Sequence, residues 1–363
     1  MEKRIKKIFE NNEKKPDAII IKNSSEPFID DNFFYVTGLE KGLFEGCATV
    51  LFEDGKAELI VSELEAESAR KANLKTHIYK NTNDFYDIII QITKSYENIG
   101  LNYNGLSVSE FNKFIKIFSD ATLLDVSKSF FKSRLIKDET EINLIKNACK
   151  ISDIAMGKIS EIIHVGVTEN ELAAEIEYVM MKNGADKAAF ETISSFGKNS
   201  AEPHYSHGNT ILKNSDFVLC DFGACFNKYN SDMTRTFIFN STNQKQKDMY
   251  ETVLEAQRIG FDFVKPGIKA KNVHQKVNNY IDGTNFKGRF IHSTGHSLGL
   301  AVHDPGGGLN ANCELELKEN MIFTVEPGIY IPGYGGVRIE DDVLVKKNGL
   351  EILTKYPREF TII

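Results

Sequence analysis

Two segments of this chain share a pattern that restricts the fold strongly. In each, an apolar strand ends in an acid, and a turn leads to a second strand that carries another acid. "FVLCD" ends at Asp221, and Asp232 precedes "MTRTF"; "MIFTVE" ends at Glu326, and Glu340 lies in "GVRIED". Apolar strands belong in a core, so they would carry these four carboxylates inward. Two carboxylates near 4 Å repel by about 4 kcal/mol at an effective dielectric constant of 20, so the four need cations.

A histidine cluster offers a nitrogen ligand for those cations. The stretch "IHSTGHSLGLAVHDPG" holds His292, His296 and His303, three of the chain's 8 histidines. A buried imidazole must be hydrogen-bonded, ionised or ligated. We therefore expect one histidine to be a ligand and the others to carry protons or bind substrate.

The combined donor set predicts the kind of metal. Carboxylates with one imidazole and no thiolate suit Mn²⁺, Co²⁺, Fe²⁺ or Zn²⁺ better than they suit a cysteine-bound structural zinc. Two divalent ions would neutralise four acids, and such a pair polarises a carbonyl, which is chemistry for cleaving an amide. The period of two along a strand adds Thr234 beside Asp232 and Arg338 beside Glu340, where they could orient the ligands.

Each motif also has an ordinary explanation. A strand-terminal acid taken alone is usually solvated, and a lone histidine is more often structural. "HSTGH" lacks the glutamate of HExxH, and "PGGG" is not followed by the Gly-Lys-Ser/Thr of a phosphate loop. Only the combination of acids and histidines predicts a site.

The chain's 363 residues and 41% hydrophobic composition allow two domains. Residues 1–127 alternate short apolar runs with helical patterns, which predicts a small α/β domain. Its expected strands are "DAIIIK", "NFFYVTG", "CATVLFEDGKAELIVS" and "LLDV", and its expected helices cover 63–72, 84–96 and 107–118. Residues 128–363 predict an α+β domain, with helices on one side of a largely antiparallel sheet.

Capping signals define the first helices of the second domain. Asp138 and Glu141 form a capping pair before a long apolar repeat, and Thr168 and Glu171 form a second capping box, with Gly184 ending that helix. Later helices are expected over 244–264 and 271–281. The expected strands are "DFVLCDFG", "MTRTFIF", "NMIFTVEPG" and "GGVRIEDDVLV".

Charge and composition argue against several classes of protein. The net charge of −7 and the absence of a basic block disfavour nucleic acid as a partner. No window approaches the roughly 18 apolar residues of a membrane span, and "MEKRIKKIFENNEKK" at the amino terminus has no apolar core of signal-peptide length, so we expect a cytoplasmic protein without membrane contact. The 5 cysteines are scattered without a CxxC pair, which indicates reduced thiols without a function.

Together these motifs resemble the pita-bread metallopeptidases, specifically the Xaa-Pro aminopeptidase and Xaa-Pro dipeptidase (prolidase) group. The resemblance runs through "FETISSFGKNSAEPHY", "DFGACFNKYNSDMTRTF", "HSTGHSLGLAVHD" and "TVEPGIYIPGYGGVRIEDDVLV", and more loosely through "NFFYVTGLEKG" in the first domain. It implies a pita-bread catalytic domain behind a creatinase-type amino-terminal domain, in a homodimer. The implied activity is hydrolysis of the bond between an amino-terminal residue and a following proline in a peptide substrate.

The resemblance also implies a metal-ligand set. Asp221 would bind one metal, Asp232 and Glu340 would bridge two, and His296 and Glu326 would complete the other. Manganese is the expected ion, with cobalt, zinc or iron as alternatives.

Further roles follow from the same resemblance. Glu326 would also serve as general base. His204, in "AEPHYSHG", and His303 match histidines that stabilise the tetrahedral intermediate and handle the scissile amide. His292 matches a residue on the proline side of the cleft, and Arg338 matches an arginine close to the ligands and the substrate's proline end.

Two other functions fit parts of the pattern. A methionine aminopeptidase, or an aminopeptidase of broader specificity, would have its metal residues in a similar order, but the methionine enzymes commonly lack a separate amino-terminal domain. A pita-bread binding protein without catalysis would resemble creatinase, which lacks the metal set. The complete set of ligand-type residues here argues against that alternative.

Overall fold

The computed structural model describes residues 1–363, which form two compact units, Met1–Arg134 and Leu135–Ile363. The sequence-based boundary, between residues 127 and 128, falls at the start of helix α6 (Ser127–Leu135), whereas the units divide at the end of that helix. None of the helices combines the length and the apolar character that crossing a bilayer requires.

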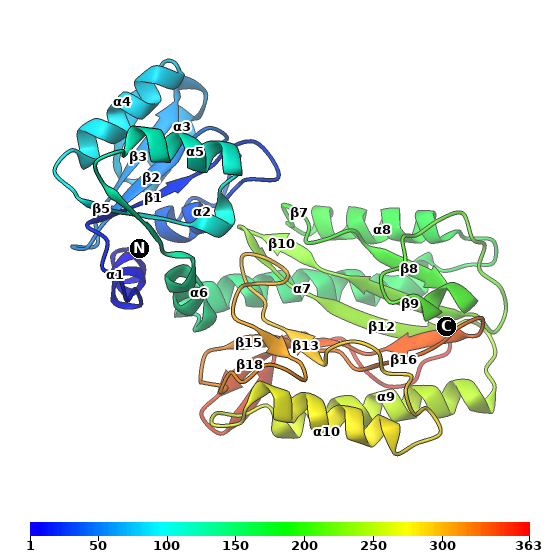
Figure 1. The fold of residues 1–363 in the computed structure, drawn as a ribbon. Coiled ribbons are helices and arrows are strands. Elements are labelled where there is room, and N and C mark those ends of the chain that lie inside the picture. The colour runs from blue at the N-terminus through cyan, green and yellow to red at the C-terminus, as the bar shows by residue number, and fades with distance from the viewer. The chain divides into compact units, whose positions relative to one another are not determined.

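Unit 1 is built on a mixed six-stranded sheet. Its strands are β1 (Ala18–Lys22), β2 (Ala48–Phe52), β3 (Ala57–Ser62), β4 (Lys75–Tyr79), β5 (Asn98–Leu101) and β6 (Thr122–Asp125). Its other helices are α1 (Glu2–Glu10), α2 (Asp31–Thr37), α3 (Ala66–Ala69), α4 (Thr82–Thr93) and α5 (Val108–Ile117). The strand order is β4-β3-β2-β1-β5-β6 (Figure 1). Ile20 and Val50 of the sheet pack against Phe85 of α4 and Phe114 of α5, so these helices cover its apolar side chains.

The prediction of a strand at "NFFYVTG" is wrong, because these residues form α2. Asp30 caps the helix by accepting a hydrogen bond from the Asn32 backbone N–H, and Gly38 ends it in the left-handed region at φ 69°. Phe33, Phe34 and their neighbours are buried on every side, so the segment shows neither helical nor strand periodicity. The expected helix over 63–72 is a short α3 flanked by 3₁₀ turns at Glu63–Glu65 and Arg70–Ala72.

Unit 2 contains four helices and several short sheets. The helices are α7 (Glu139–Ile162), α8 (Glu169–Lys182), α9 (Gln244–Phe263) and α10 (Ala270–Asp282). The strands are β7 (Lys187–Ala188), β8 (Ile193–Phe196), β9 (Phe217–Phe222), β10 (Ala224–Phe226), β11 (Tyr229–Asn230), β12 (Met233–Ile238), β13 (Gly295–His296), β14 (Gly308–Leu309), β15 (Ile322–Val325), β16 (Gly328–Ile331), β17 (Gly335–Arg338), β18 (Asp341–Lys346) and β19 (Gly349–Ile352). All the strand pairs of this unit are antiparallel, as predicted.

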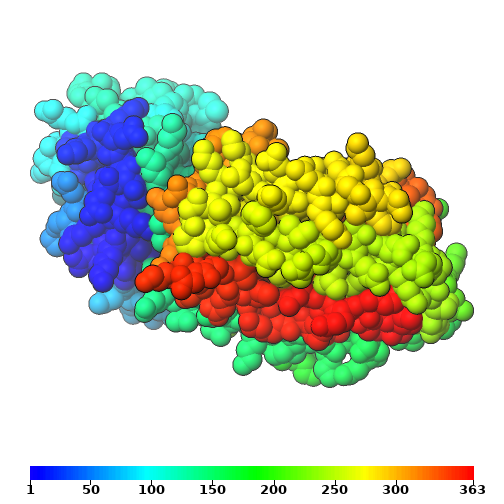
Figure 2. Space-filling view, turned by 90° about the horizontal axis from the view of Figure 1, so that it is seen from below, coloured from blue at the N-terminus to red at the C-terminus, as the bar shows by residue number.

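Two helix pairs cover different strands of unit 2 (Figure 1). Helices α7 and α8, which begin at the two predicted capping boxes, pack on β9 and β12 through residues such as Val218 and Phe237. Helices α9 and α10 pack on β16 and β17 through Ile329 and Val337. Figure 2 shows the C-terminal segment, in red, along α9, where Tyr250 donates a hydrogen bond to the Arg358 carbonyl at 2.8 Å.

The prediction of one continuous strand at "GGVRIEDDVLV" is also wrong. Strand β17 pairs with β16, while β18 pairs with β15 and β19, so the segment changes partners between Arg338 and Asp341. In the break, the backbone N–H of Ile339 donates to the Pro327 carbonyl and that of Glu340 donates to the Thr234 carbonyl. These bonds to two other segments prevent a continuous ladder and leave Glu340 beside β12.

Candidate metal centre

The first acid pair lies on two adjacent strands. Asp221 is in β9, and Asp232 immediately precedes β12; Thr234 stands opposite Asp221 in the antiparallel register. Both acids are buried, with 6% and 4% of their surfaces exposed. The chain between them passes very close to itself, because a Cβ atom on Gly223 would lie 1.8 Å from the Ser231 carbonyl oxygen. Glycine is therefore required at that point of the connection.

The other three candidate ligands come from segments far along the chain. Glu340 lies in the break between β17 and β18 and is 2% exposed, while Glu326 follows β15 and His296 ends β13. The Thr324 hydroxyl accepts a hydrogen bond from the His296 backbone N–H at 3.0 Å and donates to Glu326 Oε1 at 3.0 Å. One threonine of β15 thus positions both the histidine and the glutamate.

Four of the five candidate ligands converge. Asp232, His296 and Glu340 each have a ligand atom within 4.8 Å of the others. His296 Nε2 lies 3.4 Å from Asp232 Oδ2 and 3.5 Å from Glu326 Oε1. The fifth, Asp221, joins them through Arg338, whose Nη2 donates to Asp221 Oδ2 at 2.5 Å.

The tautomer of His296 indicates what its other nitrogen can do. Nδ1 lies 3.2 Å from the Ser297 carbonyl oxygen, which can only accept, so Nδ1 carries the proton in the neutral ring. The lone pair of Nε2 then faces carboxylate oxygens of Asp232 and Glu326. Lone pairs that face one another repel unless a cation lies between them, so this arrangement fits a metal ligand.

The electrostatics of the carboxylates favour the same interpretation. Burial, reinforced by the charges of neighbouring acids, raises the pKa of Asp232 and of Glu340 well above their usual range. Asp221 Oδ1 and Asp232 Oδ1 are buried without a hydrogen-bond donor. Oxygens of this kind are normally paired, so the donor set fits divalent cations that bind hard oxygen ligands.

Thr234 and Arg338 link the two acid pairs, as their strand positions suggested. The Thr234 hydroxyl donates to Glu340 Oε2 at 2.6 Å and accepts from Arg338 Nε at 2.9 Å. Arg338 is buried at 3% exposure and holds Asp221 with its Nη2. A single guanidinium therefore partly offsets the negative charge and fixes the side chains of both hairpins.

The three remaining site histidines lie at the edge of this centre. The ring of His303 lies 4.1 Å from that of His296, between centroids, while His292 Nδ1 lies 3.8 Å from Glu326 Oε2. Burial lowers the pKa of His292 and of His303, and the charge of His204 contributes to both shifts. His204 and His303 are exposed. These imidazoles are therefore accessible, and they interact with one another and with the acids.

Comparison with known proteins identifies the family. Residues 143–347 match the description of metallopeptidase family M24, and residues 3–136 match the creatinase/prolidase N-terminal domain. The chain belongs to metallopeptidase family M24. It is 38% identical over 361 residues to an Xaa-Pro dipeptidase of Pyrococcus horikoshii, with 99% of each chain covered, and 38% identical over 336 residues to one of Pyrococcus furiosus, covering 90% of this chain and 92% of that one.

Solved structures of relatives share the whole M24 architecture. The X-Pro aminopeptidase from Thermotoga maritima superimposes with a TM-score of 0.90 at 32% identity, covering 96% of this chain and 98% of that one. The prolidase from Pyrococcus horikoshii superimposes with a TM-score of 0.89 at 36% identity, covering 99% of each chain. The family predicted from the motifs and the pita-bread fold with its amino-terminal domain are thereby confirmed.

Three residues of the M24 site were not singled out from the sequence. Asp342 Oδ2 accepts hydrogen bonds from the Asp232 backbone N–H at 2.9 Å and from the Cys149 thiol at 3.3 Å. Tyr330 accepts from Arg338 Nη1 at 2.8 Å and lies 2.9 Å from His292 Nε2. Thr324 is the third. The only local signal was that Thr324 shares a strand face with Glu326, and that Asp342 and Tyr330 lie within motifs chosen for other residues.

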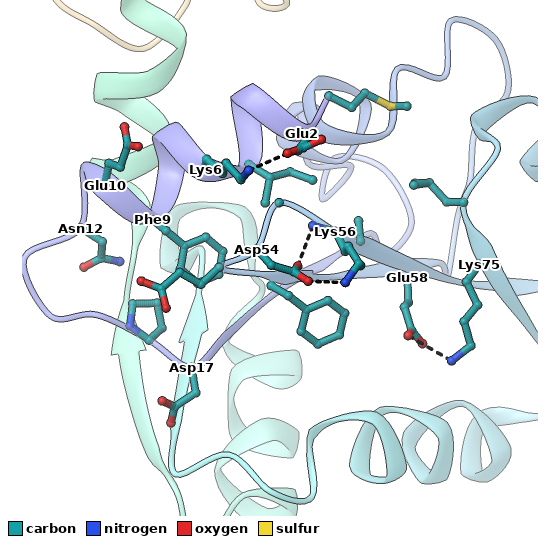
Figure 3. Close-up of a pocket in the computed structure, with 18 of the residues that line it drawn as sticks. Glu2, Lys6, Phe9, Glu10, Asn12, Asp17, Asp54, Lys56, Glu58 and Lys75 are labelled. Atoms are coloured by element: carbon teal, nitrogen blue, oxygen red, sulfur yellow. Dashed lines mark hydrogen bonds and ion pairs between the residues drawn. The ribbon is translucent and has the colours of Figure 1, made fainter.

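An open pocket of about 1690 Å³ lies within unit 1, and none of its lining residues belongs to the candidate metal centre (Figure 3). Six of its charged residues form ion pairs with one another, Lys6 with Glu2 at 2.5 Å, Lys75 with Glu58 at 3.0 Å, and Lys56 with Asp54, and both signs are present among the rest, as in Lys15 and Asp17. No histidine or cysteine lines it. The pocket therefore has neither a concentrated charge nor a set of catalytic side chains.

Proposed function

We propose that this protein hydrolyses the peptide bond between an amino-terminal residue and a following proline, as an Xaa-Pro dipeptidase. One observation carries the proposal: His296 Nε2 faces carboxylate oxygens of Asp232 and Glu326, and a Glu340 oxygen lies within 4.8 Å of the same group. The full-length relatives at 38% identity are named Xaa-Pro dipeptidases, which supports this substrate class. An aminopeptidase acting on longer Xaa-Pro peptides is the second candidate, since the Thermotoga maritima relative carries that name.

The metal would be held by five residues of this chain. Asp232 and Glu340 would bridge two ions, Asp221 would bind one of them, and His296 and Glu326 would bind the other. Divalent ions held there supply Lewis-acid polarisation of a carbonyl and lower the pKa of water. Manganese is the proposed ion, because the site is rich in carboxylate oxygens and has a single imidazole.

Protein groups around these ligands would handle the protons. Glu326 is held by Thr324 at Oε1, which leaves Oε2 toward His292 and available to take a proton from the attacking water. His204 and His303 are exposed and close to the ligands, so they can donate hydrogen bonds to the carbonyl oxygen as it gains negative charge.

The proline side of the cleft would be formed by His292. Its ring packs edge-on against Phe290 at 5.0 Å between centroids, and its Nδ1 lies 2.8 Å from the Ser293 carbonyl oxygen. Nδ1 therefore carries the proton, and Nε2 accepts from the Tyr330 hydroxyl. The fixed imidazole and the phenyl ring offer a rigid apolar wall, which suits a pyrrolidine ring that has no N–H to satisfy.

Reconstitution with defined metals tests the proposal. The protein is stripped with a chelator, reloaded with Mn²⁺, Co²⁺, Fe²⁺ or Zn²⁺, and assayed on Ala-Pro, Ala-Pro-Ala and Met-Ala. We expect Mn²⁺ to restore cleavage of Ala-Pro with little action on Met-Ala. Cleavage of Ala-Pro-Ala at a comparable rate would favour the aminopeptidase, and preference for Met-Ala would favour a methionine aminopeptidase. No turnover with any bound ion would contradict the proposal and favour a non-catalytic binding protein.

We also propose that the protein forms a homodimer, as the resemblance to the prolidase group implied. Sedimentation equilibrium of the metal-loaded protein measures this directly. A monomer at assay concentrations would contradict it without affecting the proposed chemistry.

A further inference from the structure

A buried acid outside the metal centre holds the loop that carries His204. We infer that Glu169, the first residue of α8, is a positioning residue for that histidine. The inference rests on the proposed function, in which His204 contacts the reacting carbonyl. The loop covers residues 199–211 and lies between the short β8 and the strand β9.

Glu169 is 0% exposed, and both of its oxygens are occupied by donors of this loop and its approach. Oε1 accepts from the Phe196 backbone N–H at 2.8 Å and from Asn199 Nδ2 at 2.9 Å. Oε2 accepts from the Tyr205 hydroxyl at 2.9 Å and from the Gly208 backbone N–H at 3.2 Å. The four hydrogen bonds that this fully buried carboxylate accepts are charge-assisted and therefore strong. Each donor belongs to the segment around His204.

His204 lies between two anchored residues. Its predecessor Pro203 accepts a hydrogen bond at its carbonyl from Arg338 Nη1 at 3.4 Å, and its successor Tyr205 is held by Glu169. The imidazole itself is exposed. Arg338, which also holds Asp221, therefore fixes the residue before His204, and Glu169 fixes the residue after it.

The start of α8 shapes the same loop through its backbone. Its first N–H groups have no partner within the helix, and here the Glu169 N–H donates to the Thr210 carbonyl at 3.2 Å and the Asn170 N–H to the Gly208 carbonyl at 2.9 Å. The helix is capped separately, by the reciprocal bonds of Thr168 and Glu171. The Glu169 carboxylate is therefore not needed for the cap, and its contacts serve the loop.

The substitution Glu169→Gln tests the role. It replaces one acceptor by an NH₂ group that faces donors, so at least one bond to the loop is lost and His204 shifts. We expect kcat to fall about 10–100-fold, the effect of a displacement near 1 Å, with the bound metal unchanged and KM changed much less. The matched control is Glu171→Ala, which breaks the capping box of the same helix without touching the loop, and we expect its kcat to stay within about twofold of the wild type.

A double-mutant cycle separates positioning from general damage to the fold. In a protein that already carries His204→Ala, adding Glu169→Gln should cause almost no further loss of kcat, because Glu169 acts only through that ring. If the two losses multiply, or if Glu169→Gln releases metal, the inference is overturned. Should Glu169→Gln fail to fold, Tyr205→Phe makes the same test, since it removes only one of the four bonds.

Hydrogen exchange tests the anchoring without any assay of activity. The amides of Phe196 and Gly208 should exchange slowly in the wild type, faster in Glu169→Gln, and at the wild-type rate in Glu171→Ala. Unchanged exchange in Glu169→Gln would overturn the inference. A wild-type protein that shows this exchange pattern but cleaves no Xaa-Pro peptide would contradict the proposed function alone.

Discussion

Arg338 and Thr234 hold the acids of two hairpins in one place. The guanidinium reaches Asp221 and Tyr330, and the hydroxyl of Thr234 bridges that guanidinium to Glu340. Asp221 and Glu340 are thus each held through one carboxylate oxygen, Oδ2 and Oε2, and the second oxygen of each is not used in these bonds. The Thr234 hydroxyl and the Arg338 guanidinium thus position these ligands before any metal ion binds.

The rings of His296 and His303 lie 4.1 Å apart, between centroids, but we expect His296 to bind metal and His303 to act in catalysis. His296→Ala removes a nitrogen that faces Asp232 and Glu326, so the protein should bind about one metal ion fewer and lose most of its activity. His303→Ala should retain the metal and lose kcat about 10²-fold or more. Metal content by mass spectrometry and kcat by peptide assay measure the two effects. Equal metal loss in both variants would contradict the separate roles.

A buried ion pair next to His303 is expected to matter for stability. Lys137 Nζ lies 2.9 Å from Asp304 Oδ2, and both side chains are almost fully buried. Removing one member of a buried ion pair is strongly destabilising in general, so Asp304→Asn should lower the free energy of unfolding by about 3–5 kcal/mol, as measured by urea denaturation. Glu161→Gln, which breaks the exposed pair with Lys158, is the control and should leave the midpoint unchanged. A midpoint equally unchanged in Asp304→Asn would refute the expectation.

Among the elements, β13 illustrates how close packing fixes a ligand. A Cβ atom on Gly295 would lie 1.9 Å from the Thr324 carbonyl oxygen, which belongs to the backbone of β15 and cannot move aside easily. Gly295→Ala should therefore separate His296 from Glu326, weaken metal binding at least about tenfold and lower the melting temperature. Isothermal titration with Mn²⁺ measures the first effect.

The control for that variant is a glycine with open space around it. Gly157 lies on the exposed side of α7, where an added Cβ would meet only Tyr356 at 4.0 Å. Gly157→Ala should raise stability by roughly 0.5–1 kcal/mol, because alanine favours the helix, and leave metal affinity unchanged. If Gly295→Ala bound Mn²⁺ with the wild-type affinity, the expectation that close packing of β13 fixes His296 would be contradicted.

The sequence predicted elements best where local chemistry determines them. Capping boxes located α7 and α8, and strand-terminal acids located the ends of β9 and β15. The segment at α2 was assigned to a strand because its aromatic residues are buried on all sides and leave no periodicity. The candidate ligands could be chosen from their strand ends, but Glu169 and Asp342 could not, since what distinguishes them is contact with residues distant in the chain.

In the molecule as a whole, metal and protons compete for the same buried acids. Folding raises the pKa of Asp232 and Glu340, and burial raises that of Asp342 to about 8, so without metal the native state binds protons that the unfolded chain has released. These groups stabilise the fold below the unfolded pKa and lose that contribution as the pH rises through the folded pKa. Stability of the metal-free protein should thus fall as the pH rises.

Thermal unfolding between pH 6.5 and 9 checks this linkage. In chelator, the melting temperature should fall by about 2 °C or more per pH unit. With excess Mn²⁺ the melting temperature should be higher than in chelator. This difference should widen as the pH rises, because deprotonated ligands bind metal more tightly. Glu340→Gln should flatten the profile measured in chelator. A metal-free melting temperature that climbs across this range would contradict the assignment of these acids.

The order of the candidate ligands along the chain has a consequence for biosynthesis. Asp221 is made first and Glu340 comes 119 residues later. At roughly 5–20 residues per second, the ribosome needs about 6–24 s to travel that distance. During this interval the first hairpin exists without the acid that would complete it. A nascent chain that has not reached Glu340 therefore lacks one of the proposed metal ligands, and we expect it to be inactive towards the peptides around it.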